Sequence, residues 1–227
     1  MRVIRGRAAS VEADRAVTRA LADDVRETGE AVVRVWTPHR QVAFGRRDAR
    51  AEGYERAKRA AEARGFPPYE RSVGGRAVAY TGHTLAFVRV EPVADLRKGT
   101  DERYDRIVRE LRGAFAQLGV DAYEGEPTDA FCPGAHSLSV EGAGKVVGVA
   151  QRVAKGAAQV AGIAVVRDHA EVAEVLESVY EALDVPFDAS TVGSVAAAGG
   201  PPDSETVGRA VESALVGDRE SSVEELR

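Results

Sequence analysis

Residues 131–153 read FCPGAHSLSVEGAGKVVGVAQRV, and this stretch carries the clearest indication of the fold. Apolar runs on both sides of the turn EGAG predict an antiparallel hairpin, with strands at about 136–141 and 145–153. A third apolar run predicts another strand at about 158–166. The stretch also holds the chain's only cysteine, Cys132, and Lys145, one of four lysines.

Outward from this hairpin, strands alternate with amphipathic helices. Apolar residues at helical spacing predict helices at about 11–27, 52–65, 101–118, 172–183 and 204–215. Short β-branched or aromatic runs predict strands at 31–36 and 41–44, and three more within 67–92. We therefore expect an α+β fold, in which helices flank a mixed and mostly antiparallel β-sheet.

The 227 residues are enough for one large domain and a small appendage. We place the main domain at 1–190. Residues 191–227 contain a Gly-Gly-Pro-Pro signal, a short helix and a charged end, which predict a linker, a C-terminal helix and a tail. The end of this tail could cover the functional site or could be a disordered acidic segment.

Composition excludes several function classes. A net charge of -5 argues against a nucleic-acid partner. No apolar run approaches the roughly 20 residues of a membrane-spanning helix, and the N-terminus lacks an apolar signal core. One cysteine excludes an internal disulfide, so we expect a cytoplasmic protein. The four histidines are scattered, and we expect no metal site.

Cys132 permits two interpretations. A lone cysteine is more often a buried apolar residue than a nucleophile, but the Cys-Pro-Gly turn favours exposure. A nucleophile must be a thiolate, and a nearby cation lowers the thiol pKa from about 8.5. Lys145 is the candidate cation. His136 is a weaker candidate base, because four extended residues would place it about 13 Å from the cysteine.

Lys145 itself is either a solvated side chain at a hairpin start or a group that reaches into a narrow slot. Regular alternation would put it on one face of its strand with Val147 and Val149, opposite Gly148 and Ala150.

The stretch ERSVGGRAVAY at 70–80 is a second candidate site. Its two adjacent glycines permit a tight turn and the close approach of a ligand. Arg71 and Arg76 flank them and could pair with an anionic group. The plainer interpretation is an ordinary hairpin with arginines on the surface.

Three segments together resemble one superfamily, the biotin/lipoate protein ligases and lipoyl/octanoyl transferases. They are VVRVWTPHRQVAFGR at 32–46, ERSVGGRAVAY at 70–80 and GKVVGVAQRV at 144–153. Their order and spacing match the superfamily's motifs, and the resemblance covers about 11–190. It implies a ligase-type catalytic domain that acts as a monomer.

The segment around Cys132 is most similar to the cysteine-dependent branch. Those enzymes move an octanoyl or lipoyl group from the glycine-cleavage H protein to lysines of lipoyl domains in 2-oxoacid dehydrogenase E2 subunits. The resemblance implies that Cys132 is the nucleophile, that Lys145 contacts the donor carbonyl, and that no cofactor is needed. Val73 and Tyr80 depart from the motif, which usually has Ser or Thr and often has His there.

The resemblance also implies an acyl-binding set. Its members are Arg71, Gly74, Gly75, Arg76, Ala77, Tyr80, Gly148, Ala150, Gln151 and Gln159. It leaves open whether octanoate or lipoate is bound.

Two alternatives stay open. An ATP-dependent lipoate-protein ligase would use ATP and Mg²⁺ and act through lipoyl-AMP. However, this chain has FCPGA where such ligases carry Arg-Asn-Asp, and it lacks their histidine after the lysine. A non-catalytic acyl-binding or assembly subunit is the second alternative.

Overall fold

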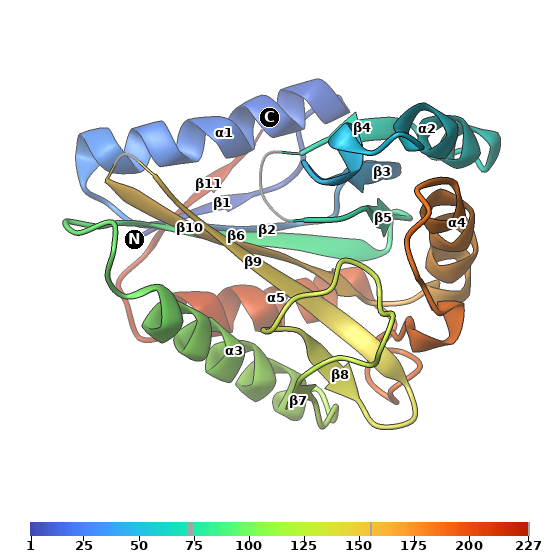
Figure 1. The fold of residues 1–227 in the computed structure, drawn as a ribbon. Coiled ribbons are helices and arrows are strands. Elements are labelled where there is room, and N and C mark those ends of the chain that lie inside the picture. Colours follow the sequence, from blue (N-terminus) through green and yellow to red (C-terminus); the bar gives the residue numbers. More distant parts are fainter. Residues whose placement is uncertain (72–74, 155, 227) are drawn as a thin grey trace.

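The computed structural model describes residues 1–71, 75–154 and 156–226. Its largest element is an eight-stranded sheet with the order β11-β1-β2-β6-β10-β9-β8-β7 (Figure 1). The strands are β1 (Arg2–Arg5), β2 (Val32–Trp36), β6 (Thr84–Pro92), β7 (Tyr123–Glu124), β8 (Leu138–Val140), β9 (Gly144–Ala154), β10 (Ala157–Val165) and β11 (Ser222–Glu225). β1 runs parallel to both of its neighbours, and the other neighbouring strands pair antiparallel.

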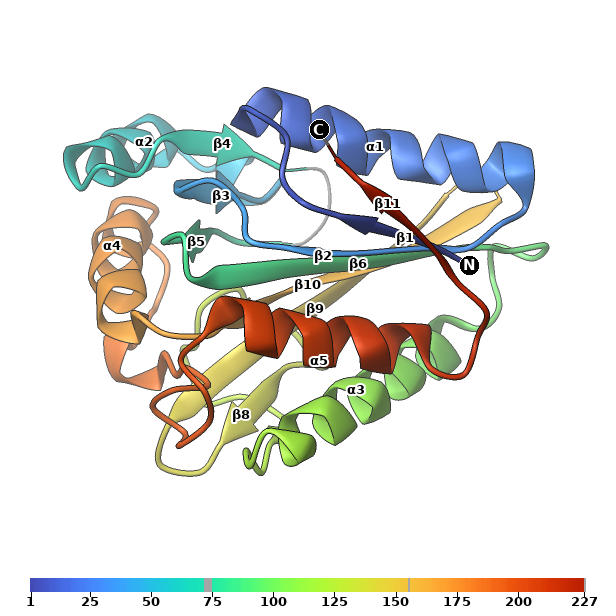
Figure 2. The same cartoon turned by 180° about the vertical axis from the view of Figure 1, so that it is seen from behind.

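Helices cover both faces of this sheet. In Figures 1 and 2, α1 lies along one face, and α3 and α5 lie side by side on the other. Their bounds are α1 (Val11–Thr28), α3 (Thr100–Gln117) and α5 (Ser204–Val216). The Ser10 hydroxyl caps α1 by accepting from the Ala13 N–H at 3.2 Å, and Gly29 ends it with a φ of 72°.

A second layer stands at one end of the large sheet. It is a three-stranded sheet with the order β4-β3-β5, packed against two helices (Figure 1). These elements are β3 (Gln41–Phe44), α2 (Tyr54–Ala63), β4 (Pro68–Glu70), β5 (Val78–Tyr80) and α4 (His169–Ala182). Short 3₁₀ turns lie at Asp48–Arg50 and Ala189–Thr191. The predicted α+β architecture with a mixed, mostly antiparallel sheet is confirmed.

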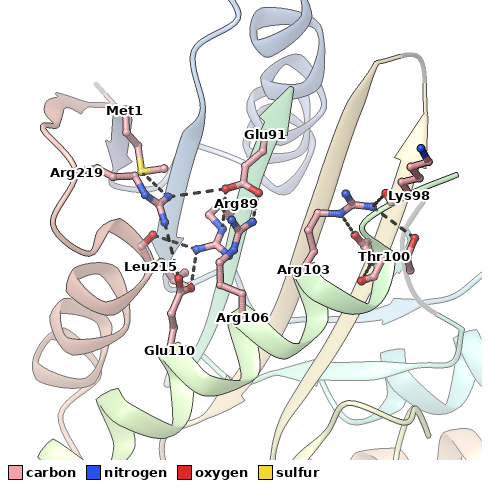
Figure 3. A network of polar contacts seen from close by, with 11 residues as sticks. Met1, Arg89, Glu91, Lys98, Thr100, Arg103, Arg106, Glu110, Leu215 and Arg219 are labelled. Carbon is pink, nitrogen blue, oxygen red and sulfur yellow. Dashed lines mark hydrogen bonds and ion pairs between the residues drawn. The ribbon is translucent and has the colours of Figure 1, made fainter. Parts of the chain in front are cut away.

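The tail takes neither of its two expected forms. Residues 222–225 form β11, which pairs in parallel with β1 at the edge of the large sheet and does not cover the site. Arg89 is fully buried and donates to Glu110 at 2.6 Å, while Arg219 approaches Glu91 and Glu110 at 3.8 Å each (Figure 3). This network holds the turn before β11 against β6 and α3.

The segment after residue 190 contacts the strand that carries Lys145. Val192 forms a bridge with Lys145, and the Gly193 N–H donates to the Lys145 carbonyl at 2.9 Å. Helix α5 adds Val207 and Val211 to the core beneath the large sheet. The division of the chain at residue 190 stays a prediction, and these contacts cross it.

The regular alternation expected along β9 is wrong at its start. Leu138 pairs with Val147, but the next residue, Ser139, pairs with Lys145, so β9 has one extra residue there. This bulge places Val146 and Val147 together in the core. It also brings Lys145 onto the side of Gly148, where an added Cβ would lie 3.7 Å from Lys145 Cε.

Among the described residues, no helix combines the length and the apolar character needed to cross a membrane.

Candidate active site

A cavity of about 630 Å³ lies between α1, the face of the large sheet and the small sheet. Trp36, Phe87 and Ile163 form much of its apolar wall, and Cys132 lies in its lining. A cavity of this size and character suits a small, largely apolar ligand.

Gly162 keeps the floor of the cavity flat. An added Cβ there would come within 2.2 Å of Phe87 Cζ and 2.4 Å of the Gly148 carbonyl oxygen. Because the second contact is backbone, a side chain at this position cannot be accommodated by a rotamer change, so the close approach of β9 and β10 requires glycine.

Cys132 is held in an unusual backbone conformation. Its φ of 42° lies in the left-handed region, which residues other than glycine seldom adopt. Its N–H donates to the Tyr180 hydroxyl at 2.6 Å, and its carbonyl accepts from Lys145 Nζ at 3.0 Å. The preceding Phe131 is fully buried in the core of the small sheet. The turn is therefore fixed from two sides.

The Cys132 thiol lies next to the positively charged guanidinium of Arg71. Arg71 Nη2 donates to Cys132 Sγ at 3.1 Å and also to the Arg76 carbonyl oxygen. Burial favours the neutral thiol, but it is outweighed by the charge of Arg71, the backbone of Arg76, the charge of Lys145 and the Arg71 hydrogen bond, so the pKa of Cys132 is lowered. The ionised thiol is therefore available at a lower pH than an ordinary cysteine would allow.

Lys145 is placed differently from what the sequence indicated. It is fully buried, and its Nζ donates to Glu126 Oε2 at 2.8 Å, to the Phe131 carbonyl at 2.8 Å and to the Cys132 carbonyl at 3.0 Å. These contacts use all three ammonium protons. Lys145 contributes to the lowered pKa of Cys132 less than Arg71 does, and it is not among the residues that line the cavity.

The predicted acyl-binding residues divide into two groups. Those that line the cavity are Arg71, Tyr80, Gly148, Ala150 and Gln159. Those that do not are Gly75, Arg76, Ala77 and Gln151. Gly74 and the neighbouring Val73 lie outside the described residues.

The second group has structural contacts instead. Arg76 pairs with the buried Asp48 at 3.2 Å. The Gln151 side chain accepts from Arg103 and donates to the Thr100 carbonyl at 3.1 Å, which joins β9 to the start of α3. Arg76 and Gln151 thus lie outside the cavity lining, and their role in acyl binding stays a prediction.

His136 contacts other partners than the thiol. Its Nδ1 lies 2.9 Å from Glu124 Oε1, and its ring stacks on Tyr104 with centroids 3.9 Å apart. Neither contact supports a role for His136 as the base that deprotonates Cys132.

Two residues of the site were not singled out from the sequence. Tyr180 reads as one more apolar residue on the buried face of its helix, and nothing local indicates its contact with Cys132. Glu126 belongs to the polar run EGEPTD, yet its carboxylate accepts from Lys145, from the Ser137 hydroxyl at 2.7 Å and from the Gly134 N–H at 2.9 Å. The Glu126 carboxylate therefore holds together the turn that carries Cys132.

Replacing Lys145 with methionine is expected to lower the free energy of unfolding by about 3 kcal/mol, because it leaves the Glu126 carboxylate without its buried partner. Urea unfolding measures this. Lys98→Met is the control, because its side chain is 83% exposed and should change stability by less than about 1 kcal/mol. Equal effects of the two substitutions would contradict a structural role for Lys145.

The profile of the family "Lipoyl protein ligase A/B catalytic domain" matches residues 11–214. The chain belongs to this family. The resemblance read from the three sequence motifs is thereby confirmed.

Relatives within the family include acyltransferases. An octanoyl-[GcvH]:protein N-octanoyltransferase from Exiguobacterium sibiricum is 32% identical over 131 residues, covering 57% of this chain and 46% of that protein. A lipoyl-[GcvH]:protein N-lipoyltransferase from Listeria monocytogenes is 25% identical, covering 66% and 54%. The chain spans about half the length of the curated relatives it matches.

Solved structures of lipoate-protein ligases share the fold. Lipoate-protein ligase A bound with ATP matches with a TM-score of 0.73 at 18% identity, covering 98% of this chain and 88% of that one. A bi-partite lipoate protein ligase from Thermoplasma acidophilum, studied with its E2 lipoyl domain, matches with a TM-score of 0.62 at 16% identity, covering 98% and 86%. At sequence identities this low, the structural similarity shows that the fold is shared and shows nothing about activity.

Proposed function

We propose that this chain transfers an octanoyl or lipoyl group to the ε-amine of a lysine on a lipoyl domain, through an acyl-thioester on Cys132. One observation carries the proposal: the thiol of Cys132 lies in the lining of an apolar cavity and accepts a hydrogen bond from the half-buried guanidinium of Arg71. The names of the relatives, which are octanoyl and lipoyl transferases acting with GcvH, support the same reaction class.

The first half-reaction makes the thioester. The Cys132 thiolate attacks the carbonyl carbon of the acylated lysine on the donor protein, and the carbon–nitrogen bond then breaks. The donor's lysine leaves as an amine and takes up the proton that the thiol lost. In the second half-reaction the acceptor lysine attacks the thioester, the carbon–sulfur bond breaks, and the thiol is restored. Two easier steps thus replace one difficult step.

Arg71 supplies the charge for this chemistry. It lines the cavity, it touches the sulfur, and its guanidinium stays protonated throughout the working pH range. The same cation can stabilise the oxyanion that forms at the acyl carbonyl. The backbone N–H of Cys132 cannot do so while it donates to Tyr180, and Lys145 is occupied by Glu126 and two carbonyls.

The cavity wall suits a medium acyl chain. The small residues Gly148, Ala150 and Ala161 expose the backbones of β9 and β10 to the cavity. Burying an acyl chain there contributes about 0.8 kcal/mol per CH₂ group, or several kcal/mol for eight carbons. Apolar contact of this kind supports octanoate or lipoate as the bound group.

The residues around Cys132 fit a magnesium-nucleotide site poorly. The carboxylate next to the cysteine turn, Glu126, is already bonded to Lys145, Ser137 and Gly134. We therefore favour the transferase over the ATP-dependent ligase.

The proposal is tested by supplying two donors separately. Octanoylated H protein without ATP should acylate a lipoyl domain, whereas free octanoate or lipoate with ATP and Mg²⁺ should not. Transfer only in the second mixture would establish a ligase. Binding of octanoate without transfer in either mixture would indicate a non-catalytic acyl-binding subunit.

Replacing Gly148 with leucine is expected to shorten the acyl chain that the cavity accepts. An added Cβ would lie 3.6 Å from Ile163 Cγ2 and 3.7 Å from Lys145 Cε, both ordinary contacts, so the fold should survive while the larger side chain enters the cavity. We expect the rate with an octanoyl donor to fall about tenfold relative to a butanoyl donor, through the loss of a few buried CH₂ contacts. Gly113→Leu on α3, remote from the cavity lining, is the control, and an unchanged chain-length preference in Gly148→Leu would contradict this placement.

A further inference from the structure

Tyr180 is buried without an evident packing reason for its hydroxyl. The side chain is 0% exposed and belongs to the apolar cluster between α4 and the small sheet. A phenylalanine would fill the same space, and a buried hydroxyl costs free energy unless it forms hydrogen bonds. The hydroxyl of Tyr180 finds both of its partners at the candidate active site.

These two partners belong to different segments. The hydroxyl accepts from the Cys132 N–H at 2.6 Å and donates to the Ala77 carbonyl oxygen at 3.1 Å. Ala77 precedes β5 and follows Arg76, whose carbonyl oxygen accepts from Arg71. One hydroxyl on α4 therefore joins the backbone of the cysteine turn to the segment that contacts Arg71.

From this geometry we infer that Tyr180 is a positioning residue, which holds Cys132 in its left-handed conformation with its sulfur against Arg71. The inference builds on the proposed role of Cys132 as the nucleophile. Tyr180 is absent from the cavity lining, so it acts through Cys132 and has no contact with the acyl group. Without the hydroxyl, the Cys132 N–H loses its acceptor, and the backbone can relax away from a φ of 42°.

The consequence is a change in the thiol itself. The charged or titratable groups that act on the Cys132 thiol are Arg71, Lys145, Tyr80 and Tyr180. Arg71 has the largest favourable effect on the thiolate, and its hydrogen bond depends on the position of the sulfur. If Cys132 moves, this effect weakens and the thiol titrates at higher pH.

The test uses Tyr180→Phe, with Tyr54→Phe as the matched control. Tyr54 packs on Phe44 at the edge of the same apolar cluster, and within the described part of the chain no hydrogen bond joins it to the cysteine turn. Because Cys132 is the only cysteine, the pH dependence of alkylation by iodoacetamide reports this thiol alone. We expect the midpoint to rise in Tyr180→Phe by about one pH unit, and single-turnover acylation at low pH to fall about tenfold. The Tyr54→Phe protein should match the unsubstituted chain.

Three outcomes would overturn the inference. An unchanged alkylation midpoint in folded Tyr180→Phe would show that the hydroxyl does not position the thiol. Equal shifts in Tyr180→Phe and Tyr54→Phe would show general loosening of the cluster. The third outcome can be measured even if the variant does not fold. Selective ¹⁵N-cysteine labelling of the unsubstituted chain gives one amide signal, that of Cys132, whose hydrogen exchange should be slow if Tyr180 accepts from it. Fast exchange of this amide would overturn the inference.

The alkylation profile also separates this inference from the proposed function. If Cys132→Ala transferred acyl groups at the full rate, the proposed function would fail. The thiol midpoint would still report whether Tyr180 positions Cys132.

Discussion

Cys132→Ala is expected to reduce acyl transfer from octanoylated H protein by a factor on the order of 10³ or more, as removal of a nucleophile does in other covalent mechanisms. The thioester cannot form without the sulfur. The fold should persist, because the side chain is only half-buried and packs at the margin of its cluster. Steady-state transfer to a lipoyl domain measures the effect, and the melting temperature checks the fold.

Cys132→Ser is the companion variant. It keeps the shape of the side chain and can still accept from Arg71, but its hydroxyl does not ionise near neutral pH. It should therefore be nearly as inactive as the alanine variant. Full activity in either variant would remove the thioester route and would favour the ATP-dependent ligase.

Arg71→Gln is expected to reduce the rate of thioester formation by about 10²–10³, because it removes the positive charge that stabilises both the thiolate and the developing oxyanion. It should also raise the pKa of Cys132, since the Arg71 charge is the largest influence that favours the thiolate. In the unsubstituted chain, Cys132 stays ionised below the ordinary thiol pKa, so acylation persists there. Acylation is lost as the pH falls through the lowered pKa of Cys132. In the variant, this loss should occur at higher pH.

The acylation rate of Arg71→Gln, measured in single turnovers across pH, separates the two effects. Raising the pH should restore the part of the loss that comes from the missing thiolate, and the part that comes from the oxyanion should stay. Arg71→Lys is the control that keeps a charge and should recover part of the rate. A profile identical to that of the unsubstituted chain would contradict the role of Arg71.

The elements of the fold were largely predictable from local patterns. The apolar faces of α1, α3 and α4 have helical spacing, and the hairpin of β8 and β9 is marked by glycines. β1 and β11 were not predicted, because each has only four residues, interrupted by charge, and forms by pairing with a segment more than 200 residues away.

Only some members of the candidate site were predictable, and their contacts were not. Cys132 and Arg71 were both identified, yet their contact depends on how two segments 61 residues apart fold together. Lys145 was expected beside the thiol because it is near in sequence, but a one-residue bulge in β9 turns it toward Glu126 and the backbone of the cysteine turn. Its charge therefore acts mainly on the turn, and that of Arg71 acts on the sulfur.

The most direct measurement is the intact mass of the protein after incubation with octanoylated H protein in the absence of ATP. A covalent octanoyl adduct on Cys132 is expected, removable by hydroxylamine and absent from Cys132→Ala, because a thioester is the intermediate. A chain that forms no such adduct, but acylates a lipoyl domain once ATP, Mg²⁺ and free lipoate are added, would contradict the thioester mechanism.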